Sequence, residues 1–280
     1  MLGICTSFYD SLKIELENKI PKSALAALPH SYFIVGDILT LKLNGELTKY
    51  KTKIGSAILK IVPSARSIAL IGEIKGKKRE PSIEIIAGSK KTETVHKEHG
   101  CSFALDIAKI MWSKGNKGEK LRLLNLATPR EIVVDMFAGI GYFSIPLAKH
   151  KKAEVHAIDV NPNALKFLKK NVFLNGIADR VKIYKGDSKE IIAKLNVTPD
   201  RILMGYFPAY DFFDSAMKIS KKGTVIHFHD KATENDVPEH LEKLKSMAAK
   251  NGKFLDVLDI QQVKSYAPHV WHYVYDLSVV

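Results

Sequence analysis

The chain has 280 residues, 46% of them hydrophobic and 26% charged, which is enough for one large domain or two modest ones with full cores. Its apolar runs are shorter than the ~20 residues that cross a bilayer, and its first residues lack a basic-then-apolar signal pattern, so we expect a cytoplasmic protein and no membrane partner. The two cysteines form no C-x-x-C pair and indicate neither a disulfide framework nor a zinc site.

The formal net charge of +13 is unevenly distributed. Residues 1–130 hold 22 Lys and Arg against 12 Asp and Glu, whereas residues 131–280 hold 21 against 18. A basic excess in the first part of the chain favours a polyanionic partner, most simply a nucleic acid. A lysine-rich composition is also common in thermophilic proteins, so charge alone leaves both interpretations open.

The first part of the chain predicts a small α+β domain over residues 1–108. Apolar residues at helical spacing from Tyr9 to Leu28 predict a helix that ends at Pro21 or Pro29. Strands and one more helix are expected next, in the order strands 32–43, helix 50–62, and strands 67–71, 83–87, 92–96 and 101–105.

Strands alternate with helices in the second domain, residues 109–280, after a helical linker at 119–126. The expected strands are 132–135, 154–158, 181–185, 200–204 and 223–229, and the expected helices are 142–149, 161–175, 188–195, 209–219 and 234–250. Two late strands, 254–263 and 270–278, have no helix between them and predict an antiparallel hairpin at one sheet edge. The alternation predicts an α/β fold with a parallel sheet and helices on both faces.

The run 133–147 is typical of a strand, a glycine turn and a helix start, where α/β folds hold a nucleotide-like cofactor. Gly139 and Gly141 allow a tight turn and a close approach to a ligand. The third glycine of a dinucleotide fingerprint is replaced by Ser144, which disfavours a diphosphate-binding loop. Asp135 ends the strand, and a carboxylate there suits the cationic S-adenosylmethionine better than NAD.

Polar residues also follow the next two strands. Asp159 ends one of them, where it would accept hydrogen bonds from the ribose hydroxyls. Asp187 and Ser188 follow the other and could take the adenine amino group. His227 and His229 share one face of a later strand, but without a third ligand nearby in sequence we expect ordinary strand histidines and no metal.

Several motifs occur in a specific order: Asp135 to Gly141, Ala157-Ile158-Asp159 with Asn161-Pro162, Asp200 to Met204, and Lys264 to Pro268. This combination resembles the tRNA position-37 enzymes from about Gly36 to the C-terminus, and Arg79 before Glu84 to Gly88 resembles their arginine-bearing turn. The resemblance implies a Rossmann-like class I methyltransferase domain, S-adenosylmethionine as cofactor and tRNA as partner. Two branches share these motifs: the tRNA (guanine-37-N1) methyltransferases and the wybutosine-pathway aminocarboxypropyltransferases.

The branch depends mainly on the residues after Met204. The methyltransferases usually carry Asn-(Leu or Pro)-Pro there, and often an extra small N-terminal domain for which this chain leaves no obvious room. Gly205-Tyr206 and the late Val270-Trp271-His272 resemble the aminocarboxypropyltransferases instead, although Pro208 departs toward the methyltransferase motif. The expected activity is aminocarboxypropyl transfer to a tricyclic wybutosine precursor, 4-demethylwyosine in type, in tRNA(Phe), with guanine-37 methylation as the alternative. A non-catalytic, cofactor-dependent RNA-binding protein is a third possibility.

The resemblance also implies roles for residues outside the strand ends. Ser113 and Lys120 would contact the cofactor, although the family usually has Arg in place of Lys120, and Lys lacks the planar fork that grips a carboxylate twice. Glu119 would be the general base and Arg79 would stabilise charge on the modified base. The alternatives are a solvated glutamate at a helix start and an arginine that contacts phosphate.

Contacts with the tRNA are expected from the basic turn and from aromatic side chains. Lys77 and Lys78 would meet the phosphate backbone, which gives affinity and orientation but no base identity. Tyr206 is a candidate to stack on a flipped base. Phe207 and Tyr142 are further candidates, for which a plain core role is equally open.

Overall fold

The structure is a computed structural model that describes residues 7–75, 80–112 and 116–280. The chain divides into two compact units. The first comprises Met1–Lys97 with Ala104–Trp112, and the second comprises Glu98–Phe103 with Ser113–Val280. Among the described residues, no helix is both long and apolar enough to cross a bilayer.

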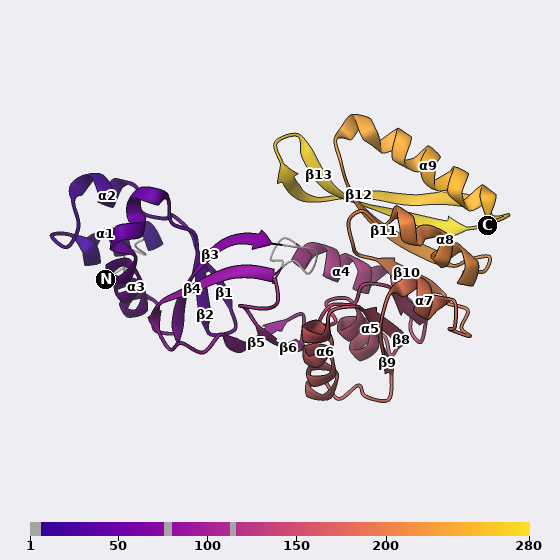
Figure 1. Ribbon diagram of the computed structural model, residues 1–280, viewed down its shortest axis with the longest axis horizontal. Helices are drawn as coiled ribbons and strands as arrows, with labels where there is room; N and C mark the ends of the chain where they lie inside the picture. Colours follow the sequence, from indigo (N-terminus) through magenta and orange to yellow (C-terminus); the bar gives the residue numbers. More distant parts are fainter. Residues whose placement is uncertain (1–6, 76–79, 113–115) are drawn as a thin grey trace, which may run out of the picture. The chain divides into compact units, whose positions relative to one another are not determined.

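The first unit is an α+β assembly, drawn in indigo to magenta in Figure 1. Its sheet has the order β1-β2-β3-β4, in which β2 and β3 run parallel and the other neighbours antiparallel. Helices α1, α2 and α3 contribute to one apolar core with this sheet. The elements are α1 (Phe8–Leu16), α2 (Lys22–Ala26), β1 (Phe33–Val35), β2 (Ile38–Leu41), the 3-10 helix η1 (Gly45–Tyr50), α3 (Lys51–Ile61), β3 (Ser67–Lys75) and β4 (Glu80–Gly88). The two-stranded sheet of β5 (Glu93–Glu98) and β6 (Cys101–Asp106) follows, and its residues Glu98–Phe103 are assigned to the second unit.

Of the two ends expected for the helix between Tyr9 and Leu28, the later one at Pro29 is wrong, since the first helix ends before Pro21. The chain forms two helices there, because Asn18 adopts a left-handed backbone conformation with φ +63° and ends the first helical run. Pro21 is the N-cap of α2. The N-cap has an extended backbone, which proline readily adopts.

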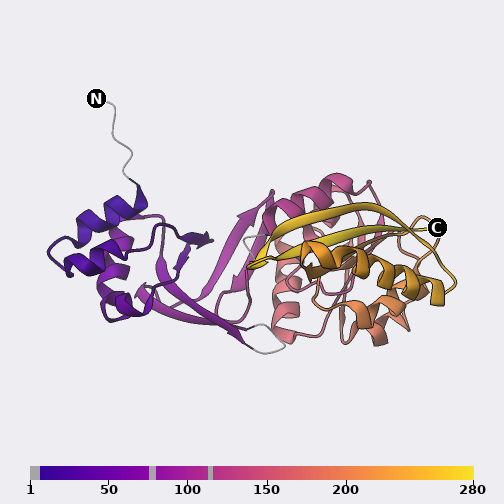
Figure 2. The same ribbon diagram turned by 90° about the horizontal axis from the view of Figure 1, so that it is seen from above.

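The second unit is built on a seven-stranded sheet of order β12-β13-β11-β10-β7-β8-β9. Strands β11, β10, β7, β8 and β9 run parallel, which confirms the α/β prediction. Strands β12 and β13 form the predicted antiparallel hairpin at one edge, and Figure 2 shows the pair in yellow side by side. The elements are α4 (Lys117–Leu126), β7 (Ile132–Asp135), α5 (Ser144–His150), β8 (Glu154–Asp159), α6 (Pro162–Leu174), β9 (Val181–Lys185), α7 (Ser188–Ile192), β10 (Arg201–Met204), α8 (Tyr210–Ile219), β11 (Val225–Ala232), the 3-10 helix η3 (Glu234–Asp236), α9 (Val237–Lys250), β12 (Leu255–Ala267) and β13 (Val270–Val279).

The two faces of β11 and β13 differ in chemistry. Phe228 and Tyr275 lie in the apolar core that also takes buried residues of α7, α8 and α9. Their sequence neighbours His227 and Asp276 point to the opposite face, because successive residues of a strand alternate between faces. Both are buried, and Arg122 of α4 reaches Asp276 from that side. The polar face of these strands is therefore the face that α4 covers.

Candidate active site

The carboxyl ends of four parallel strands lie at one edge of the sheet. Asp135 ends β7 and Asp159 ends β8, while Asp187 follows β9 and Tyr206 follows β10. Ligands of open α/β sheets bind outside this edge. The fold therefore brings together the residues that the sequence marked at three strand ends, and adds the segment after β10 beside them.

The glycine turn after β7 has a backbone that other residues rarely adopt. Gly139 has φ +58° and Gly141 has φ +93°. A Cβ on Gly141 would lie 2.7 Å from Ile145 and 2.8 Å from Leu168, well inside van der Waals contact. The turn therefore requires glycine at position 141 on both conformational and steric grounds.

Asp159 links this turn to the end of β8. Its carboxylate accepts hydrogen bonds from the backbone N–H of Gly139 and of Asn161, each at 2.7 Å. Burial raises the pKa of Asp159, and the two backbone donors oppose that rise. Each carboxylate oxygen has a second lone pair, so the group can also accept from a diol while it holds the turn.

Asp135 is 1% exposed. Ser144, which replaces the third glycine of the dinucleotide pattern, holds its carboxylate. The Ser144 hydroxyl donates to Asp135 Oδ2 at 2.6 Å, and the N–H of Phe137 donates at 3.3 Å. Burial raises the pKa of Asp135 from 3.8 to about 6, against the effect of these two donors. The serine is thus part of the site, since it orients a carboxylate that a glycine would leave without this partner.

Asp187 and Ser188 mainly stabilise the start of α7. Asp187 is the N-cap and accepts from the N–H of Lys189 at 2.8 Å. Ser188 is buried and its hydroxyl donates to the carbonyl of Met136 in the glycine turn. This bond ties the start of α7 to the turn, so the third strand end is joined to the first.

Tyr206 belongs to a group of aromatic rings at the same edge. It stacks on Phe137 of the glycine turn, with ring centroids 5.1 Å apart and planes 28° apart. Phe212 of α8 lies edge-on to both rings. Phe207 instead packs edge-on against His272 at 4.8 Å. Tyr206 therefore offers a stacking surface beside the turn, whereas Phe207 faces β13.

Lys120 is buried on α4, and its ammonium forms an ion pair with the buried Glu98. It also lies 5.5 Å from the centre of the Tyr142 ring. Burial lowers the pKa of Lys120 and Glu98 raises it. Lys120 thus contacts Glu98 and the rings of Tyr142 and Phe103.

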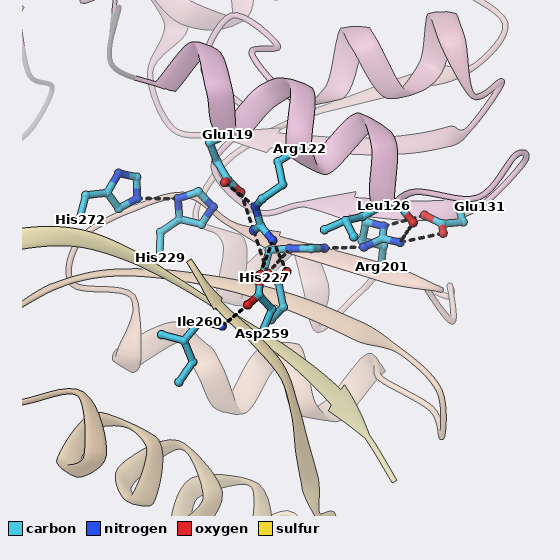
Figure 3. A network of polar contacts seen from close by, with 11 residues as sticks. Glu119, Arg122, Leu126, Glu131, Arg201, His227, His229, Asp259, Ile260 and His272 are labelled. Carbon is cyan, nitrogen blue, oxygen red and sulfur yellow. Dashed lines mark hydrogen bonds and ion pairs between the residues drawn. The ribbon is translucent and has the colours of Figure 1, made fainter. Parts of the chain in front are cut away.

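Glu119, the neighbour of Lys120 on α4, is only 3% exposed. Arg122 donates to both of its carboxylate oxygens, from Nε at 2.8 Å and from Nη2 at 2.9 Å. Figure 3 shows the Arg122 guanidinium between Glu119 and the sheet. Burial raises the pKa of Glu119 and Arg122 opposes the rise. The alternative of a solvated glutamate at a helix start is therefore wrong.

Four of the predicted site residues lie outside the part of the chain described with side chains. They are Lys77, Lys78, Arg79 and Ser113. Among the described residues, no group of three His, Cys, Asp or Glu side chains is arranged to hold a metal ion. His227 instead contacts Asp276 and Arg201, and His229 contacts His272.

Sequence reasoning missed the polar residues beneath α4. Arg122 and Arg201 form ion pairs with the buried carboxylates of Glu119, Asp276 and Glu131, and no motif indicated these pairs. A signal was present, because β13 alternates His272 and Asp276 with the apolar core residues Tyr273 and Tyr275. A polar stripe on a central strand predicts charged partners on the covering helix.

Comparison with known proteins identifies the family. Residues 94–258 match the model of the TRM5/TYW2 methyltransferase domain, and residues 12–92 match that of the TYW2 N-terminal domain. The chain belongs to the TRM5/TYW2 family. A member from Pyrococcus horikoshii, named tRNA(Phe) (4-demethylwyosine(37)-C(7)) aminocarboxypropyltransferase, is 39% identical over 94% of each chain. The tRNA (guanine(37)-N(1))-methyltransferase Trm5b of Pyrococcus abyssi is 37% identical over 93% of this chain and 78% of its own length.

A solved structure of the family matches nearly the whole chain. The crystal structure of P. horikoshii TYW2 in complex with MeSAdo superimposes with a TM-score of 0.85 at 36% identity, covering 97% of this chain and 99% of that one. The Rossmann-like methyltransferase fold of the TRM5/TYW2 family thus holds for the present chain.

Asp135 makes the stability of this family member depend on pH. Because its pKa is higher in the folded than in the unfolded chain, its contribution is fully present below about pH 3.8 and is lost as the pH rises through about 6. Over this range we expect the free energy of unfolding of the wild type to fall by about 3 kcal/mol relative to Asp135→Asn, measured by urea unfolding. Asp211→Asn, at an exposed position of α8, is the control, and parallel pH curves for wild type and Asp135→Asn would contradict the assignment.

Proposed function

We propose that this chain transfers the 3-amino-3-carboxypropyl group of S-adenosylmethionine to the tricyclic 4-demethylwyosine-type base at position 37 of tRNA(Phe). The observation that carries the proposal is the match of the first part of the chain to the TYW2 N-terminal domain, because residues 94–258 match a model that both branches share. Residues 12–92 match the TYW2 N-terminal domain, and 94% of the chain aligns with a tRNA(Phe) aminocarboxypropyltransferase. A cytoplasmic location accompanies a tRNA substrate and stays a prediction.

The site fits S-adenosylmethionine. A Cβ at Gly141 would fill the turn after β7, and carboxylates end both β7 and β8. Bound there, the cofactor supplies an electrophilic γ-carbon, which gains a bond to C7 of the base as its bond to sulfur breaks and methylthioadenosine leaves. The MeSAdo held by the P. horikoshii structure is this leaving product.

Each predicted cofactor residue has a proposed task. Asp159 accepts from the ribose hydroxyls, and Asp187 with Ser188 lies toward the adenine. Asp135 faces the positive charge of the sulfonium and amine, and the hydrogen bond from Ser144 orients its carboxylate for this contact. Gly139 and Gly141 provide the close backbone approach, while Ser113 and Lys120 serve the methionine arm.

The remaining predicted residues act on the RNA. We assign residues 1–108 to tRNA contact, with Lys77 and Lys78 on the phosphate backbone, and residues 109–280 to the transfer reaction. Tyr206 stacks on the target base, for which its ring beside Phe137 is suited. Glu119 accepts the proton that the base loses, and Arg79 stabilises charge that develops on the base.

The group transferred is read directly with S-adenosylmethionine labelled separately on the methyl and carboxyl carbons. With tRNA(Phe) that carries the tricyclic precursor, we expect carboxyl label in the RNA and methylthioadenosine as the small product. Methyl label in the RNA, with adenosylhomocysteine released, would overturn the proposal in favour of the guanine-37 methyltransferase. RNA without either label would indicate a binding protein.

The ribose role of Asp159 predicts a loss of cofactor affinity in Asp159→Asn. Removing a charged acceptor from two hydroxyls should weaken binding of methylthioadenosine about 10- to 100-fold, measured by calorimetry. Asp179→Asn, an exposed aspartate before β9, is the matched control. An affinity equal to that of the wild type would place the ribose elsewhere.

A further inference from the structure

A chain of buried and partly buried polar groups joins α4 to the sheet, and we call it the α4 cluster. It runs through six residues of the second unit, in the order Glu119, Arg122, Asp276, His227, Arg201 and Glu131. Figure 3 shows it extending from the start of α4 beneath the helix to the segment before β7. Its first member is the proposed proton acceptor, so its electrostatics bear on the reaction.

Arg122 is shared between two buried carboxylates. It holds Glu119 through Nε and Nη2, and it holds Asp276 through Nη1 at 2.6 Å and Nη2 at 3.2 Å. A third carboxylate, Asp259 of β12, lies 3.3 Å from Nη1, but its side chain is 55% exposed. The guanidinium therefore has two strong counter-charges and needs only one to remain neutralised.

The hydrogen bonds of His227 fix its protonation state. Arg201 has only donors, so His227 Nε2 accepts from it, and His227 Nδ1 must then carry the proton that is donated to Asp276 at 2.6 Å. Burial lowers the pKa of His227, while Asp276 raises it. The imidazole is neutral, and it fixes Asp276 as an ionised acceptor.

The cluster carries an excess of negative charge. Counting the described residues alone, three carboxylates, those of Glu119, Asp276 and Glu131, share two guanidiniums. Burial acts to raise the pKa of Asp276, but hydrogen bonds from His227 and Arg122 bring it to about 2. Burial also acts to raise the pKa of Glu131, but hydrogen bonds from Arg201 and from the backbone N–H of Thr128 outweigh it and lower that pKa. An added proton therefore goes to Glu119.

We propose that Asp276 and Arg122 are positioning residues that make Glu119 the proton acceptor of the transfer reaction, an inference that rests on the proposed function. As C7 of the base gains its new bond, its proton passes to a Glu119 oxygen. Arg122 then keeps Asp276 as its counter-charge, so no guanidinium is left buried without one. Without Asp276, protonation of Glu119 would leave Arg122 with only the exposed Asp259 as its counter-charge, which is costly for a guanidinium that is largely withdrawn from water.

The charged groups around Glu119 determine whether each substitution raises or lowers its pKa. Arg122 on α4 lowers its pKa, and Asp276 of β13 and Asp259 of β12 raise it. His227 of β11 is neutral and adds no charge. Asp276→Asn should therefore lower the pKa of Glu119, and Arg122→Lys, which keeps the charge but loses the fork, should raise it.

The test is the pH dependence of the single-turnover rate, measured on the full chain with S-adenosylmethionine and precursor tRNA. The acid limb should move to lower pH in Asp276→Asn and to higher pH in Arg122→Lys, each by about one unit. The plateau rate of Asp276→Asn should fall about threefold, because a weaker base accepts the proton less readily. Asp259→Asn, the same change on an exposed partner of Arg122, should shift the limb far less.

Opposite shifts support the proposal, because a merely structural role moves both profiles alike or neither. Thermal unfolding and methylthioadenosine binding establish that each variant is folded. If Asp276→Asn does not fold, Arg122→Lys decides alone, and an unshifted limb in that folded variant overturns the proposal. If adenosylhomocysteine is the product, the proposed function fails separately, and the same profiles are read from that product because methylation at guanine N1 also releases a proton.

Discussion

A guanidinium that is largely withdrawn from water has to keep a counter-charge, and Arg122, whose side chain is 19% exposed, meets that constraint with buried carboxylates from its own helix and from β13. Of the ten residues of α4, the buried ones are Glu119, Lys120 and Leu123, so the inner side of this helix is mostly charged. Its attachment to the second unit depends on ion pairs, with Glu98 on one side and Asp276 on the other. The position of α4, and with it the proposed catalytic residue, depends on these pairs.

The other half of the site is organised through backbone contacts. Asp159 holds the N–H of Gly139, and Ser188 holds the carbonyl of Met136, so the glycine turn is fixed from two neighbouring strand ends. Asp135 is fixed by Ser144. Such a site is formed before its ligand arrives, which lowers the ordering cost of binding. In the proposed function the two halves divide the work, since the strand ends would bind the donor and α4 would supply the proton acceptor.

The sequence predicted the sheet and its carboxyl edge because both follow from local patterns. Alternating elements imply parallel strands, and the carboxyl ends of parallel strands must share an edge. Asp135 and Asp159 were found in this way. The burial of Glu119 and the pairing of Lys120 with Glu98 could not be predicted, since they depend on contacts between segments far apart in the chain. The break between α1 and α2 was left open between Pro21 and Pro29, because a left-handed asparagine leaves no mark in apolar periodicity.

The central claim is that Glu119 is the member of the α4 cluster that takes up a proton. Carbon-13 NMR of glutamate carboxyl groups, with the Glu119 signal assigned from Glu119→Gln, measures its pKa in the protein bound to methylthioadenosine. We expect Glu119 to titrate above its ordinary value of 4.5, with Asp276 still ionised through that range. A Glu119 signal that stays ionised down to the titration range of Asp276 would contradict the claim.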